Sequence, residues 1–132
     1  MPIELIWDDE DRSIIHERFI GHWTWEEFHE NAVEIRHMAE SVSHRVDVIA
    51  DLEASEGMPI GPAITQARAA MREVPPNWQG IIVVSGSWLV KTLTSVYQSV
   101  SRNSFSIVQV DHVDEIPDTI ARMRAHESRT SD

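Results

Sequence analysis

The sequence contains no cysteine, and this absence excludes several kinds of chemistry. A disulfide framework, a thiolate metal site and a thiol nucleophile all need cysteine, and its absence fits the reducing interior of a cell. No apolar run approaches the roughly twenty residues that a helix needs to span a bilayer. The start of the chain, Met1-Pro2-Ile3-Glu4, lacks the basic and apolar stretches of a secretion signal. We therefore expect a cytoplasmic protein without a membrane span.

Positive charge is also scarce. The chain has 22 acidic and 11 basic residues, of which only Lys91 is a lysine, and its formal net charge is -11. A polyanion would be repelled by the average field of such a surface, so we expect no nucleic-acid partner. The length of 132 residues is sufficient for one domain with a hydrophobic core.

The familiar catalytic motifs are missing as well. The sequence has no Ser-x-x-Lys, no Gly-x-Ser-x-Gly and no phosphate-binding loop. The pair His29 and His37 lies on a predicted helix, but eight residues separate the two rings, which turns them roughly 80° apart around the helix axis. We therefore predict no catalytic residue, no metal and no cofactor.

The clearest signal that is present is the apolar run from Ile81 to Val84. Four β-branched residues between Gly80 and Ser85-Gly86 predict a strand that is apolar, and therefore covered, on both faces. Leu89, Leu93, Val96 and Val100 follow at helical spacing, so a helix is expected to start where this strand ends. This junction is the carboxyl end of a strand, where open α/β sheets place their ligands.

The remaining elements are predicted by periodicity and by turn residues. Strands are expected over 3–7, 13–20, 45–52 and 104–110, the first two forming a hairpin. Helices are expected from Trp25, after the capping box formed by Thr24 and Glu27, from Ile60 to Val74, and over 114–125. The order β-β-α-β-α-β-α-β-α predicts a single α/β domain over residues 1–126, followed by a frayed tail over 127–132. Its five-stranded sheet should be mainly parallel, with the first strand antiparallel and with four helices.

This order of elements, together with the strand Val48-Ile49-Ala50-Asp51-Leu52, resembles the STAS domain of bacterial anti-sigma-factor antagonists, a SpoIIAA-like fold. The wider superfamily includes Sec14-like carriers. In the phosphoswitch members, a Ser or Thr between Asp and Gly opens the helix after the second interior strand. Here that region reads Met58-Pro59-Ile60-Gly61-Pro62, without a hydroxyl. The resemblance therefore implies a STAS-like domain that lacks the classical phosphorylation switch.

Several polar residues follow the two interior parallel strands and should emerge at one edge of the sheet. A Ser-Gly-Ser turn at a helix start can also cap that helix without binding anything, and this is the commoner arrangement. As an alternative, the turn and a lysine one turn later could hold a small anion. The candidate ligand-binding residues are Asp51, Glu53, Ser55, Ser85, Gly86, Ser87 and Lys91.

Three functions are compatible with these observations. The leading hypothesis is a non-enzymatic regulatory or protein-interaction domain that binds a partner protein or a second copy of itself as a homodimer. The alternative is a carrier or sensor of a small apolar or anionic ligand, as the Sec14-like relatives suggest. A hydrolase that uses Asp51 with one of the histidines is the third.

Overall fold

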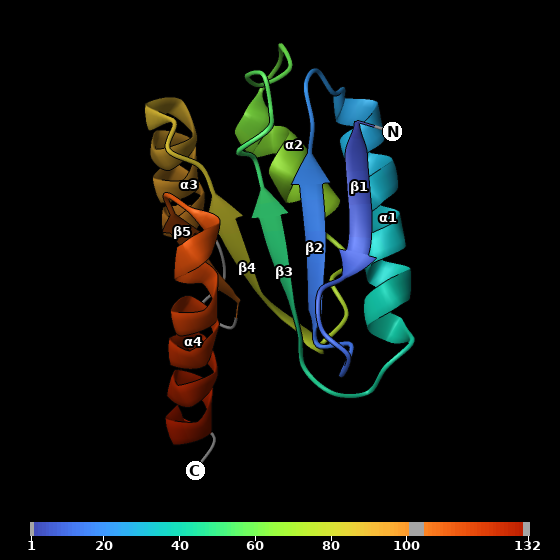
Figure 1. Cartoon of the computed structure of the whole chain (residues 1–132). Coiled ribbons are helices and arrows are strands. Elements are labelled where there is room, and N and C mark those ends of the chain that lie inside the picture. Colours follow the sequence, from blue (N-terminus) through green and yellow to red (C-terminus); the bar gives the residue numbers. More distant parts are fainter. Residues whose placement is uncertain (1, 101–104, 131–132) are drawn as a thin grey trace.

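The computed structural model describes residues 2–100 and 105–130, and its elements follow the predicted order (Figure 1). They are β1 (Ile3–Trp7), β2 (Ile14–Phe19), α1 (Trp25–Glu40), β3 (Val46–Asp51), α2 (Ala63–Ala70), β4 (Trp78–Val84), α3 (Trp88–Val100), β5 (Ser106–Val110), the short 3-10 helix η1 (Val113–Glu115) and α4 (Ile116–Thr130). The tail predicted over 127–132 falls partly on α4 and partly on residues 131–132, which lie outside the described residues.

The five strands form one sheet in the order β1-β2-β3-β4-β5. β1 is antiparallel to β2 and every other pair is parallel, which confirms the predicted α/β class. The hairpin turn is fixed by Asp9, whose carboxylate accepts hydrogen bonds from the backbone N–H of Ser13 at 2.8 Å and of Ile14 at 3.0 Å. The acidic turn seen in the sequence is therefore a structural device.

The helices cover the two faces of the sheet unequally (Figure 1). Because the parallel strands follow one another in sequence, right-handed crossovers place α1, α2 and α3 on the same face. After β5 the chain returns over the other face, where Ile116, Ile120 and Met123 of α4 pack against Ile49 and Ile82. The central strand is thus covered on both sides, as its sequence predicted.

The side chains on the two faces of β4 are buried to different extents. Ile82 and Val84 are fully buried under α4. Ile81 and Val83, on the opposite face, are only half-buried, so the face under α1, α2 and α3 is covered less completely. The reason is a cavity that lies between these two side chains and the helices above them.

The start of α1 agrees with its prediction, whereas that of α2 does not. The capping box of α1 is confirmed, with Thr24 and Glu27 satisfying each other's backbone N–H groups. α2, in contrast, begins at Ala63, because Gly61 has a φ of +129° and Pro62 follows it. Ile60 is consequently 100% exposed and does not extend the apolar face of α2.

The apolar stripe predicted for α3 is rotated by about one position. Leu89 and Val96 are about half exposed, at 48% and 46%, whereas Val90 and Thr94 are buried and Leu93 is half-buried. Apolar residues occupy both sides of this helix, so spacing alone did not distinguish two overlapping stripes.

A buried carboxylate joins α4 to the sheet. Asp47 of β3 is 0% exposed and accepts hydrogen bonds from Arg45 at 3.0 Å and from Arg124 of α4 at 3.0 Å. Gly80 permits this approach, since a Cβ there would lie 2.7 Å from the Asp47 Oδ1 and 2.5 Å from the terminal methyl of Met123. The polar side chain of Asp47 suggests that its face of β3 is polar, whereas the structure shows that this face is buried.

Candidate functional site

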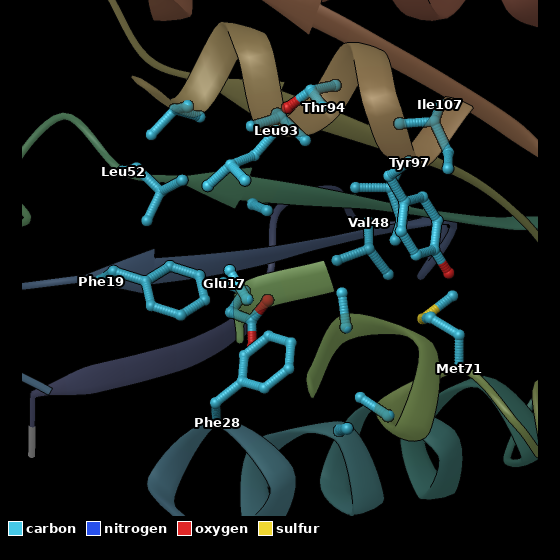
Figure 2. Close-up of a pocket in the computed structure, with 18 of the residues that line it drawn as sticks. Glu17, Phe19, Phe28, Val48, Leu52, Met71, Leu93, Thr94, Tyr97 and Ile107 are labelled. Carbon is cyan, nitrogen blue, oxygen red and sulfur yellow. The ribbon is translucent and has the colours of Figure 1, made fainter. Parts of the chain in front are cut away.

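A cavity of about 170 Å³ lies between the sheet and the three helices α1, α2 and α3 (Figure 2). Its floor includes Val48 of β3, Ile81 and Val83 of β4, and Ile107 of β5. The space exists because the helices above it present small side chains. These are Ala32 on α1 and Ala63, Ala67 and Ala70 on α2.

Aromatic side chains form one end of the cavity. Phe19, Trp23, Trp25 and Phe28 all line it, and their rings pack with centroid separations of 4.7 Å for Phe19 and Trp23, 5.2 Å for Trp23 and Trp25, and 5.5 Å for Trp25 and Phe28. We call these four residues the aromatic wall. The structure thus places both Trp23 and Trp25 in the cavity wall.

The loop between β3 and α2 is tied to this wall. The indole N–H of Trp23 donates to the hydroxyl of Ser55 at 2.8 Å, and that of Trp25 donates to the carbonyl of Ile60 at 3.1 Å. Met58 of the same loop lines the cavity. This loop therefore forms part of the aromatic end of the cavity.

One acidic side chain projects into this apolar space. Glu17 of β2 is 4% exposed, and Figure 2 shows its carboxyl group extending towards Phe28 of α1. Within residues 2–100 and 105–130 the structure shows no hydrogen bond and no ion pair to this carboxyl group. Burial without a compensating partner raises the pKa of Glu17 from its ordinary 4.5 to about 8. The group is therefore mainly protonated and neutral at pH 7.

Two hydroxyl groups complete the polar lining. Thr94 and Tyr97 of α3 line the cavity opposite Glu17, and neither side chain has a hydrogen bond within the described part of the chain. Burial raises the pKa of the Tyr97 phenol, while the nearby Arg68 guanidinium acts in the opposite direction. No basic side chain lines the cavity as described.

Asp51, predicted as a site residue, lies on the other face of the sheet. It is buried, accepts a hydrogen bond from the backbone N–H of Glu53 at 3.0 Å, and contacts the His16 Nε2 at 2.9 Å. His16 Nδ1 is 3.6 Å from a carboxylate oxygen of Asp8. The structure thus selects His16 as the histidine partner of Asp51, but no hydroxyl group contacts this ring within the described residues. A hydrolytic role stays a prediction.

The remaining predicted residues lie at the same edge of the sheet but make separate contacts. Ser55 bonds Trp23, Glu53 accepts from the backbone N–H of Val113 at 3.2 Å, and Lys91 pairs with Asp111 at 2.8 Å. In the turn, the Ser85 hydroxyl accepts from the N–H of Ser87 at 3.1 Å, and the Ser87 hydroxyl accepts from Val90 at 3.5 Å, while Gly86 links them. The contacts of Ser85 and Ser87 are those of a helix cap, whereas Glu53, Ser55 and Lys91 each bond a different distant segment, and the structure does not bring the seven residues into one cluster.

Sequence reasoning missed Glu17, although a signal was present. Ile15, Glu17 and Phe19 alternate on the inner face of β2, so a glutamate interrupts a row that is otherwise buried and apolar. A carboxyl group in the middle of an apolar face is the pattern that could have indicated the cavity.

Comparison with protein-family models, with curated proteins and with solved structures gives no match. Among the described residues, no three His, Asp or Glu side chains gather in a way that could hold a metal ion. In that same part of the chain, every helix is too short or too polar to cross a bilayer.

Proposed function

We propose that the protein is a carrier or sensor that binds a small, mainly apolar ligand in the cavity. The observation that carries this proposal is an apolar cavity with a buried, unpartnered carboxyl group inside it. Protein interiors normally pack without such voids. A bound apolar ligand would fill this space and give the side chains that line it the packing contacts they lack.

The volume limits the ligand to a small molecule. An apolar cavity of about 150 Å³ is large enough to hold benzene, so the space here suits one ring or a short branched chain with a small polar group. Because no basic side chain lines the cavity in the described residues, an apolar ligand is favoured over the anionic one that the sequence also allowed.

We infer that the ligand enters the cavity at its aromatic end. Trp25 and Met58 are only half-buried there, and both lie in or against the loop between β3 and α2. Gly57 and Gly61 of this loop have φ angles of +85° and +129°. Backbone hydrogen bonds between Gly21 and both Ala54 and Glu56 fix the first part of the loop, so we infer that only the segment 57–62, held by the Trp25 indole, moves aside.

The proposed function is related to both parts of the family resemblance. A carrier corresponds to the Sec14-like relatives, whereas a regulatory domain of STAS type would use the same cavity to sense a metabolite and alter its surface. Neither role needs the phosphorylation switch, since α2 begins at Ala63 and its first turn is preceded by Gly61-Pro62.

Filling the cavity should abolish binding. Ala67→Leu adds three carbon atoms at the cavity wall, so we expect affinity for toluene to fall at least about tenfold while stability is kept or raised. Ala121→Leu, at an exposed position of α4, is the matched control and should bind toluene as the wild type does. Calorimetric titration measures both. Unchanged toluene affinity in Ala67→Leu, or no binding by the wild type, would contradict the proposal.

Self-association through β1 is a second candidate role. β1 is an edge strand, and Ile6 on its outer face is 59% exposed. Ile3, Leu5 and Trp7, which the sequence suggested as the contact, instead pack on the α1 side of the sheet. We propose that the strand edge pairs with a second copy about a two-fold axis, because edge strands are commonly protected in this way.

Sedimentation at low and high salt tests this second role. The net charge of -11 opposes association, so a dimer held by apolar contact should become tighter as ionic strength rises. A monomer at high protein concentration in both buffers would rule out the homodimer.

A further inference from the structure

We propose that the ligand of the cavity is an apolar amine, whose ammonium group pairs with the carboxylate of Glu17 while its apolar body fills the space beneath α2 and α3. This inference rests on the proposed function and specifies its ligand class. It follows from the position of Glu17, the rings beside it and the absence of competing charge.

Glu17 is the only charged residue that faces the cavity in the described chain. Its neighbours on the adjoining strands are Leu5 of β1 and Ala50 of β3, and neither can bear charge. α1 and α2 present aromatic and aliphatic side chains, and α3 adds Thr94 and Tyr97, so the phenol is the one other titratable group. No cation of the protein is available to pair with the carboxylate, which leaves that role to a ligand.

The aromatic wall supports the same choice. A cation is attracted to the faces of Trp, Tyr and Phe rings, and cages of such rings recognise ammonium groups. Figure 2 shows the Glu17 carboxyl group pointing towards Phe28, whose ring is in T-shaped contact with that of Trp25. A carboxylate beside an aromatic wall provides both the charge and the polarisable surface that an ammonium group needs.

Binding must release a proton. In the empty cavity Glu17 is protonated, because burial disfavours its charged form. When an ammonium ion enters, the carboxyl O–H bond breaks, the proton leaves to solvent and the N–H donates to the resulting carboxylate. One proton is released for each amine bound, so affinity should rise about tenfold per pH unit until the pH reaches the pKa of Glu17.

Ligands with other head groups should differ in how their affinity depends on pH. A neutral alcohol or ketone would use the protonated carboxyl group as a hydrogen-bond donor, and its affinity would fall as that proton is lost. A carboxylate ligand would be repelled at high pH and would find no basic partner at low pH. The pH dependence of affinity therefore separates the three ligand classes.

The test uses three probes of nearly equal shape, namely benzylamine, benzyl alcohol and benzoate. Calorimetric titration into the full chain at about pH 6 and about pH 8 should give a benzylamine affinity that rises roughly fiftyfold, with about one proton released at pH 6 and about half a proton at pH 8. Benzyl alcohol affinity should stay level or fall, and benzoate should not bind. Glu17→Gln should lose the preference for benzylamine but keep benzyl alcohol, whereas Glu30→Gln, at an exposed position of α1, should match the wild type.

The outcomes separate this inference from the proposed function. Binding of benzyl alcohol without a preference for benzylamine, or a preference that survives Glu17→Gln, would overturn the amine assignment and leave an apolar-ligand protein. Failure of all three probes to bind would overturn both.

Discussion

Glu17→Gln should remove a large loss of stability that the wild type undergoes as pH rises from about 4.5 to about 8. The carboxyl group is buried in the cavity without a hydrogen bond in the described chain, and burial raises its pKa to about 8 from 4.5. In the unfolded chain the same group has its ordinary pKa. The folded protein therefore binds one more proton than the unfolded protein throughout this interval.

The direction of the effect follows from this proton. Below pH 4.5 both states are protonated and the contribution of Glu17 is fully present. As pH rises towards 8 the unfolded state gains from ionisation and the folded state does not, so the free energy of unfolding falls. Each pH unit is worth about 1.4 kcal/mol, and the whole interval amounts to about 5 kcal/mol. Such a loss is a large part of the stability of an ordinary domain.

Urea unfolding at several pH values measures this difference. The stability of Glu17→Gln minus that of the wild type should increase by about 5 kcal/mol between pH 4.5 and pH 8. Taking the difference removes the contribution of the other titratable groups. Glu30→Gln should show a flat difference, since its side chain is exposed. A flat difference for Glu17→Gln as well would mean that its carboxyl group is not desolvated.

Arg124→Met should cost about 3 kcal/mol of stability. The guanidinium of Arg124 donates to Asp47 at 3.0 Å and to the carbonyl of Ser13 at 3.0 Å, and so it joins α4 to the ends of β2 and β3. Asp47 is fully buried, and after the substitution Arg45 would be the one remaining arginine in contact with it in the described chain. Removing one partner of a buried charge costs far more than removing a surface pair.

Arg122→Met is the matched control on the same helix. Its guanidinium is exposed and makes a hydrogen bond of 3.4 Å to Thr119, so its loss should change stability by about 0.5 kcal/mol or less. The midpoint of urea unfolding compares the two variants. Equal midpoints would show that the contact between Arg124 and Asp47 does not hold α4 on the sheet.

The order of elements could be predicted from the sequence because each boundary has a local physical cause. Thr24 and Glu27 start α1 by capping it. The turn from Ser85 to Ser87 interrupts the apolar run, so β4 ends before it and α3 starts after it. Parallel pairing then follows from the alternation of strands and helices. The hairpin, the α1 stripe and the central strand needed no long-range information.

The cavity could not be predicted in this way. It depends on the summed volumes of side chains from three helices, and in particular on alanines of α1 and α2 that meet only in the folded chain. The rotation of α3 is likewise a result of packing, since two apolar stripes on that helix fit the same spacing. Asp47 is a similar case, because its partner Arg124 lies 77 residues away in the sequence.

The predicted polar residues illustrate the same limit. Ser55 and Lys91 were placed correctly at one edge of the sheet by the parallel topology, but their partners were not predictable. Ser55 became a support for Trp23, and Lys91 pairs with Asp111 after the next strand. Topology locates residues, whereas their chemistry depends on side chains that come from elsewhere in the chain.

A methyl NMR titration with benzyl alcohol tests most directly the central claim that the cavity binds a ligand. The account predicts saturable shifts at Val48, Leu93 and Ile107, which line the cavity, and none at Ile82 and Ile120 on the α4 face of the sheet. Shifts that fail to saturate, or that are confined to exposed side chains such as Ile60, would contradict it.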